Sequence, residues 1–413
     1  MTSLWSNSFG SRTGLAGLTA MAFLLASPAV CAQPPVGGAV PAGAPAMPGE
    51  SLLVQAAKAE GDLRFESAID RLYELLIEHP GTADALTARL RMARLLAVTG
   101  SLPQAILECQ LLRDELPMDH PLRAEALALA TVLARRLRAS PSSGAPYFAI
   151  FEPVPARGVQ ALDEPRALVF EGESRFVLLD EGAGRVYRVG AESASPVASP
   201  QDPTAAAVMP DGTLVMAGKT GLMTVPASRT IQLSGTWGGK ARQAKKVRSM
   251  AALSDGSLLV VDRDYDGVLR CQLSSGACAP WGPIGKYRVV KVGPTDWVYL
   301  LDDRGQGVRV IDASQRAITL VGPVAGVTKL EKIGDIAVDA AHGLCLLDTD
   351  LKRILIVHLK TGADGRIGPM LTATVALPQE GERAVKNPTA IGVSPSGSVY
   401  VAGKSSPRMM RYR

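Results

Sequence analysis

Residues 248–271 read RSMAALSDGSLLVVDRDYDGVLRC, a stretch in which two turns separate three apolar runs. The first turn is Ser-Asp-Gly, and the second carries the acidic tip Asp-Tyr-Asp-Gly. Glycine favours tight turns because it adopts a positive φ without a steric penalty. The stretch therefore predicts three antiparallel strands.

The same pattern of three apolar runs separated by two turns recurs along the chain at spacings of about 40–55 residues. Its six copies span 165–189, 203–225, 248–271, 288–311, 334–357 and 388–412. We expect a fourth, outer strand in the connecting segments, such as 229–237. A constant period of four-stranded units predicts a six-bladed β-propeller and not a sandwich. The last copy holds only three strands, so 147–154 would complete it and close the ring.

The last copy and the propeller region as a whole also resemble known families. The run N-P-T-A-I-G-V from Asn387, followed by P-S-G-S-V-Y-V, resembles an NHL repeat. Residues 145–413 as a whole resemble the six-bladed, TolB-like propeller group. That group includes lactonases, lyases, sensors and interaction modules, so the resemblance implies the fold and leaves the activity open.

Residues 51–140 have a helical pattern that repeats once. Phe65, Ala68, Leu72 and Pro80 correspond to Leu102, Ala105, Cys109 and Pro117, each 37 residues later. This resembles the tetratricopeptide repeat, with Gly100 at its turn position and 121–138 as a capping helix, although Gln55, Ala56 and Ala59 depart from the first-helix signature. The predicted fold class is α + β multidomain: a short α-helical hairpin-repeat domain followed by an all-β six-bladed propeller.

The N-terminal 50 residues predict export. Residues 1–32 have a basic start, a short apolar core and a small-residue cleavage site, as in a signal peptide, and 33–50 form a Pro/Ala/Gly-rich linker. We expect a periplasmic or extracellular protein without a transmembrane span. The alternative signal is a bacterial lipoprotein signal with a lipid anchor at Cys31, although Val30 and Pro28 depart from its usual pattern.

Four cysteines follow Cys31. A two-residue turn at Ser274-Ser275 would place Cys271 opposite Cys278, and an exported protein is in a compartment where a disulfide persists. We therefore predict a Cys271–Cys278 disulfide, with two free thiols as the alternative. Cys109 and Cys345 lie in apolar runs and are expected in the core.

The motif DRDYDG matches the start of a calcium-binding loop, with Asp262, Asp264 and Asp266 as candidate metal ligands. The later ligand positions hold Arg270 and Leu273, where an acid would be needed. We therefore favour an acidic turn in which the carboxylates accept backbone N–H bonds. No other cofactor is expected.

Catalytic signals are weak. A lactonase-like centre would need several Glu, Asn and Asp ligands, yet Asn387 is the only asparagine after the signal. The chain has no G-x-S-x-G motif and no histidine pair with metal-ligand spacing. The histidines are interpreted as surface or capping residues; they are His79, His120, His342 and His358.

A basic segment separates the second and third blades. It contains Lys240, Arg242, Lys245, Lys246 and Arg248. Connections of this kind emerge on a propeller face, where basic residues attract an anionic lipid, cell-wall polymer or acidic protein. The alternative is a solvated loop without a partner. Nucleic acid is not expected, because the chain is exported and only 5% aromatic.

Together these features favour an exported scaffold or interaction protein and not an enzyme. It would bind a protein or a cell-envelope component through its helical repeats and propeller face. Two alternatives stay open: a metal-dependent propeller hydrolase of the lactonase kind, and a domain that senses a small ligand.

Overall fold

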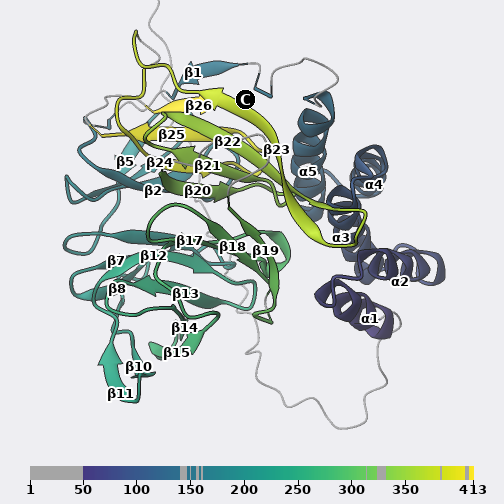
Figure 1. Cartoon of the computed structure of the whole chain (residues 1–413), viewed down its shortest axis with the longest axis horizontal. Helices are drawn as coiled ribbons and strands as arrows, with labels where there is room; N and C mark the ends of the chain where they lie inside the picture. The colour runs from purple at the N-terminus through teal and green to yellow at the C-terminus, as the bar shows by residue number, and fades with distance from the viewer. Residues whose placement is uncertain are drawn as a thin grey trace, which may run out of the picture. The chain divides into compact units, whose positions relative to one another are not determined.

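The computed structural model describes residues 50–139, 147–148, 150–154, 158–159, 161–312, 314–322, 332–381, 384–404 and 409–413 (Figure 1). The predicted signal peptide, Cys31 and the linker therefore lie outside the described residues, apart from Glu50. In the part of the chain that the structure describes, five helices are followed by six β-sheets, as the sequence predicts.

The helices alternate with short turns, and each packs on the next in sequence. Their bounds are α1 (Glu50–Gly61), α2 (Phe65–Glu78), α3 (Ala83–Thr99), α4 (Leu102–Glu115) and α5 (Pro121–Arg138). Thr82 caps α3 by accepting a hydrogen bond from the Ala85 amide, and Gly100 ends it in the left-handed region. Among the described residues, no helix is long and apolar enough to cross a membrane. The structure shows a helical region, and its likeness to tetratricopeptide repeats stays a prediction.

The six sheets are numbered here as blades 1–6 in chain order. Blade 1 contains β2 (Pro165–Phe170), β3 (Phe176–Asp180), β4 (Arg185–Val189) and β5 (Ala194–Pro196); blade 2 contains β6 (Ala205–Val208), β7 (Leu214–Gly218), β8 (Gly221–Val225) and β9 (Thr230–Ile231). Blade 3 contains β12 (Val247–Ala252), β13 (Ser257–Asp262), β14 (Val268–Gln272) and β15 (Ala277–Trp281), extended by β10 (Ser234–Trp237) and β11 (Lys240–Gln243). Blade 4 contains β16 (Tyr287–Val292), β17 (Val298–Asp302), β18 (Val308–Ile311) and β19 (Ala317–Val321), with a short 3-10 helix, η1 (Pro294–Asp296). Blade 5 contains β20 (Ile333–Val338), β21 (Leu344–Asp348), β22 (Arg353–Thr361) and β23 (Ile367–Ala376); blade 6 contains β24 (Pro388–Val393), β25 (Val399–Gly403), β26 (Met410–Tyr412) and β1 (Phe151–Pro153).

The first strands of the blades form a closed ring. Each of β2, β6, β12, β16, β20 and β24 contacts the next, and β24 contacts β2. The N-terminal strand β1 pairs antiparallel with β26 and completes blade 6, which confirms the predicted ring closure. Closure of this kind leaves no free inner edge for another chain to pair with.

Polar side chains of the first strands join neighbouring blades. Thr204 Oγ1 donates to the Val247 carbonyl oxygen at 2.7 Å, linking blades 2 and 3. Ser249 Oγ and the Val290 backbone exchange two hydrogen bonds between blades 3 and 4. Buried polar groups of this kind need such partners, because an unpaired one costs about 1–3 kcal/mol. These hydrogen bonds therefore fix the spacing of adjacent blades around the central channel, which is the space enclosed by the ring of first strands.

One segment differs from the sequence-based prediction. Residues 229–237 were expected to form the outer strand of blade 2, but only β9 pairs with β8. Strand β10 instead pairs with β11 in a hairpin and lies parallel to β15 of blade 3. The close approach depends on Gly235, since a Cβ atom there would lie 2.0 Å from the Cys278 carbonyl oxygen. Only the start of 229–237 therefore belongs to blade 2, and β10 extends blade 3.

Strands β14 and β15 pair Cys271 with Cys278, the register expected from the turn at Ser274-Ser275. The structure has a disulfide between these two residues. Cys109 and Cys345 are free and buried, as predicted.

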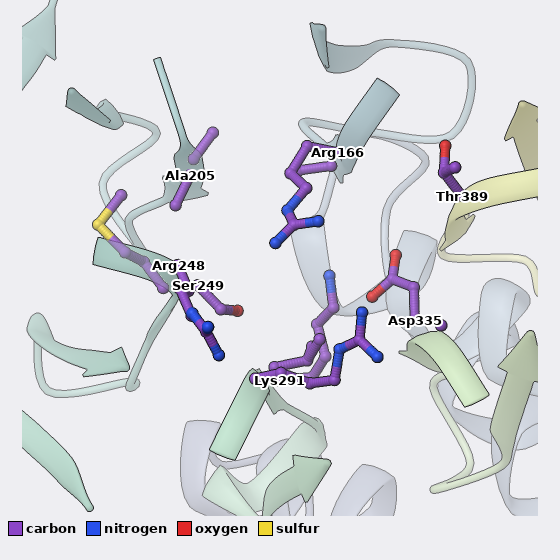
Figure 2. Close-up of a pocket in the computed structure, with 13 residues that line it drawn as sticks. Arg166, Ala205, Arg248, Ser249, Lys291, Asp335 and Thr389 are labelled. Carbon is purple, nitrogen blue, oxygen red and sulfur yellow. The ribbon is translucent and has the colours of Figure 1, made fainter. Parts of the chain in front are cut away.

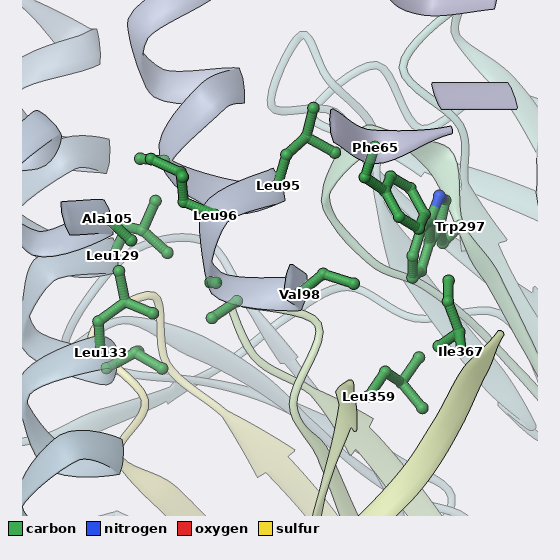
Figure 3. Close-up of a cluster of buried hydrophobic side chains, with 14 of the residues drawn as sticks. Phe65, Leu95, Leu96, Val98, Ala105, Leu129, Leu133, Trp297, Leu359 and Ile367 are labelled. Carbon is green, nitrogen blue, oxygen red and sulfur yellow. The ribbon is translucent and has the colours of Figure 1, made fainter. Parts of the chain in front are cut away.

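The helices and the propeller share a hydrophobic core, part of which is drawn in Figure 3. Phe65 of α2 lies against Trp297, which precedes β17, with ring centroids 6.3 Å apart. Both residues are 3% exposed. Helix α3 also contacts the long strand β22, and buried Arg135 of α5 donates to the Gly397 carbonyl oxygen. The fold therefore buries one face of the helices against blades 4–6.

Two histidines are buried, so their assignment to the surface was wrong. His342 and His358 are 3% and 0% exposed. Strand β22 continues past Val357 to Thr361, so His358 lies within the strand, where Nδ1 and the Thr372 hydroxyl are 2.6 Å apart. His120 does cap α5, because its side chain accepts a hydrogen bond from the Leu122 amide. Hydroxyl partners explain how neutral imidazoles are accommodated in the core.

Candidate anion-binding site

A β-bulge opens the first strand of five blades. The pairing register skips one residue near the start of each strand, namely Arg166, Arg248, Arg288, Gly334 and Thr389. In blade 2, Thr204 stands at the corresponding place before β6. Bulges redirect a side chain away from the regular pleat, and here they act at one end of the channel. Three of the six blades thus present an arginine at the same level.

These arginines line a narrow part of the channel, called here the constriction. Its cavity measures about 30 Å³ and its lining includes Arg166, Arg248, Arg288, Lys291 and Asp335. Figure 2 shows the nitrogen atoms of Arg166, Arg248 and Lys291 directed toward one shared space, with Asp335 on another side of it. All four cationic side chains are half-buried. The constriction therefore concentrates positive charge in a partly desolvated space.

The four cations differ in their partners. Arg166 Nε lies 3.4 Å from Glu181 Oε2, and Arg248 Nη1 lies 2.6 Å from Asp303 Oδ1. Within the described ranges, Arg288 and Lys291 have neither a side-chain hydrogen bond nor an ion pair. These two groups are therefore available to a ligand.

Burial, followed by the positive charge of Arg166, lowers the pKa of Arg288. The nearby Arg248 charge acts in the same direction. A shift in this direction means that its surroundings disfavour the charged form. An anion in the constriction would relieve that unfavourable interaction.

Asp335 does not neutralise the constriction through direct pairing. The Asp335 Oδ1 atom accepts from the Ile336 amide at 2.8 Å, and Oδ2 accepts from the Ile391 amide at 3.0 Å. The residue is 4% exposed. Its carboxylate therefore serves mainly to join blade 5 to blade 6.

Two wider cavities adjoin the constriction, and we call all three together the basic mouth. Their volumes are about 320 and 330 Å³, and both share Arg166 with the constriction. The basic side chains that line the mouth are Arg166, Lys219, Lys245, Lys246, Arg248, Arg263, Arg288, Lys291 and Lys332. The acidic ones are Glu164, Glu181, Asp202 and Asp335. Among the described residues the lining is thus predominantly cationic, and such a concave surface attracts anions.

The chain matches no protein-family model and no curated protein. Among solved structures it is similar to hydrazine synthase from Kuenenia stuttgartiensis, at 14% identity over 62% of this chain and 97% of that chain, with a TM-score of 0.44. It is also similar to a gluconolactonase from Xanthomonas campestris, at 11% identity over 64% and 95% of the two chains and a TM-score of 0.45. It is similar as well to virginiamycin B lyase from Staphylococcus aureus, at 11% identity over 64% of this chain and 98% of that chain, with a TM-score of 0.41. These identities are too low to transfer any site residue.

The fold divides the basic segment that the sequence singled out. Lys240 and Arg242 lie on β11, a fully exposed strand of the β10–β11 hairpin. Lys245 and Lys246 line the basic mouth, and Arg248 reaches the constriction. The segment is therefore partly a strand and not one loop, and only its second half faces the channel.

Arg166 and Arg288 were missed at the sequence level. Both occupy the position of Arg248 when the copies PRALVF, VRSMAA and YRVVKV are aligned. That alignment contained the signal, because three copies place arginine second. The repeated arginine could not be assigned to the channel without knowledge of the bulge. In a strand with regular alternation, the arginine side chain at this position would lie between two blades.

The candidate calcium ligands do not converge. Asp262 is buried and accepts hydrogen bonds from the Lys246 and Asp264 amides, both at 2.8 Å. Asp264 lies 3.0 Å from Lys246 Nζ, and Asp266 is exposed. In the part of the chain that the structure describes, no group of three or more His, Cys, Asp or Glu side chains could hold a metal. The geometry supports the acidic-turn interpretation.

Proposed function

We propose that this protein is an exported, non-enzymatic binding protein whose basic mouth captures an anionic partner from the cell envelope. The observation that carries this proposal is the placement of Arg166, Arg248 and Arg288 by equivalent bulges. A bulge costs ladder hydrogen bonds, so its repetition in the same place on several blades suggests a selected feature. Export rests on the signal-like residues 1–32.

The hydrolase alternative has less support. A channel metal in a propeller would need several oxygen or nitrogen ligands directed at one point. Asp335 is the one carboxylate among the described residues of the constriction, and both its oxygens accept backbone N–H groups. The surrounding arginines and lysine would also repel a cation. The site therefore suits an anion better than a metal.

Binding to a polyanion provides the test. Purified full-length protein is applied to heparin-agarose and eluted with a salt gradient, since exposed charge contacts are screened by salt. The variant Arg166→Gln/Arg288→Gln should elute at clearly lower salt and bind soluble heparin at least about a hundredfold more weakly, because each of the two lost charge-assisted hydrogen bonds contributes about 1.5–3 kcal/mol and about 1.4 kcal/mol is a factor of ten.

Strand β11 of blade 3 provides a matched control. Lys240→Gln/Arg242→Gln removes the same charge from the exposed hairpin, away from the mouth. This pair should elute like the wild type. Equal shifts in elution salt for the two double variants would show that heparin binding depends on net charge alone, and the proposal would then be wrong. Melting temperatures of both variants should show that the fold is kept.

A further inference from the structure

We infer that the constriction is a discrete oxyanion site that takes one terminal phosphate group. This inference rests on the proposed function, because it specifies the chemical group that the basic mouth holds at its narrow end.

The size of the constriction limits the ligand. A cavity of about 30 Å³ has about the space of one or two water molecules, so only the terminal oxygen atoms of a ligand group enter it. A sugar ring or an aromatic ring does not fit there. The adjoining cavities of about 320 and 330 Å³ would take the rest of a ligand. A small charged terminus on a larger body meets both conditions.

The number of donors favours phosphate over carboxylate. Three guanidinium groups with five N–H donors each, together with one ammonium group, come from blades 1, 3 and 4. A carboxylate offers two oxygens and about four acceptor sites, which one or two arginines already fill. A terminal phosphate offers three strongly accepting oxygens and a charge near −2. It can therefore be approached from several blades at once.

The acids in and beside the mouth leave its centre positive. Glu181 and Asp303 pair with Arg166 and Arg248. These contacts hold two of the guanidinium groups in place, as expected for a preorganised site. Arg288 and Lys291 have no such partner among the described residues, and Asp335 is committed to backbone amides. A dianion would thus be balanced by the two unpaired cations.

The direct test uses small probes. Inorganic phosphate, phenyl phosphate, acetate and chloride are titrated into full-length protein at equal ionic strength, with calorimetry and melting temperature as readouts. Phosphate and phenyl phosphate should bind with similar affinity, because the ring stays outside the constriction. Acetate should bind at least tenfold more weakly. A melting temperature that rises equally with phosphate and chloride would overturn the inference.

Variants locate the binding. Arg288→Gln/Lys291→Gln should weaken phosphate binding at least tenfold, whereas Lys219→Gln/Lys332→Gln removes equal charge from the wider cavities and should change it less than threefold. Arg288→Lys keeps the charge and should lose part of the affinity, since lysine cannot form a bidentate contact. Equal losses for the two double variants would contradict a discrete site.

The outcomes separate this inference from the proposed function. Heparin binding that depends on Arg166 and Arg288 but is unaffected by phosphate would keep the proposed function and reject the phosphate site. Phosphate binding at the constriction without specific heparin binding would keep the site and reject capture of a polyanion. Sedimentation with phosphatidic acid vesicles, with phenyl phosphate as competitor, then distinguishes a lipid headgroup from a free phosphate ester.

Discussion

The Thr389 hydroxyl donates a 2.7 Å hydrogen bond to the Pro165 carbonyl oxygen, and this bond joins blade 6 to blade 1. Thr204 makes the same bond to Val247, also at 2.7 Å. Both threonines stand in the tripeptide Pro-Thr-Ala, and both lie at the position where other blades present arginine. One sequence position therefore serves two purposes: threonine joins blades, and arginine forms the basic mouth.

Replacing Thr389 with valine should weaken the junction between the last and first blades. Valine keeps the shape of the threonine side chain but lacks the hydroxyl donor. We therefore expect a loss of about 1–2 kcal/mol in the free energy of unfolding. Urea unfolding checks this value. Thr230→Val on the exposed strand β9 serves as control and should change the free energy by less than about 0.5 kcal/mol. Equal effects at the two positions would show that the bond between blades contributes nothing.

The sequence predicted the blades well because the period resides in local turns. Each copy supplies its own Gly-containing turn, so the number of blades and the ring closure follow from chain order alone. The β10–β11 hairpin could not be foreseen, because Gly235 is required by the Cys278 carbonyl oxygen, a contact made only in three dimensions. The site was found in part: Arg248 was named as one of a basic run, and its equivalence to Arg166 became visible only with the bulges.

The interface between α2 and blade 4 should contribute strongly to stability. Phe65→Ala removes a ring that is 3% exposed and packs against Trp297 (Figure 3). Truncation of a buried phenylalanine usually costs about 3–5 kcal/mol. We expect a loss in that range, with a red shift of Trp297 fluorescence as water reaches the ring. The exposed Ile77 on the same helix provides the control, and Ile77→Ala should be nearly neutral.

Stability should fall in mild acid because of His342. Burial, with a smaller effect from Arg94, lowers the pKa of His342 from 6.5 to about 3. The unfolded chain therefore binds a proton below pH 6.5 that the folded chain does not bind until about pH 3. Stability from this group is fully present above pH 6.5 and is lost as the pH falls toward 3.

A variant isolates that contribution from the other titrating groups. His342 has a φ of +58°, which asparagine tolerates, so His342→Asn keeps the backbone and removes the proton site. The stability difference between wild type and variant should be constant above pH 6.5. It should then change in favour of the variant by up to about 1.4 kcal/mol per pH unit below that value. A difference that stays constant down to pH 4 would show that the pKa of His342 is not lowered in the folded protein.

Calcium should leave the protein unchanged, because the acids of DRDYDG have different partners. Asp262→Asn weakens a buried acceptor of two backbone amides and should cost about 1–3 kcal/mol. Asp264→Asn removes only an ion pair with Lys246 in which both side chains are about 60% exposed, so we expect almost no effect. Urea unfolding with calcium, and again with a chelator, measures both quantities. If calcium stabilises the wild type and Asp264→Asn abolishes that gain, the three carboxylates do form a metal site and the acidic-turn interpretation is wrong.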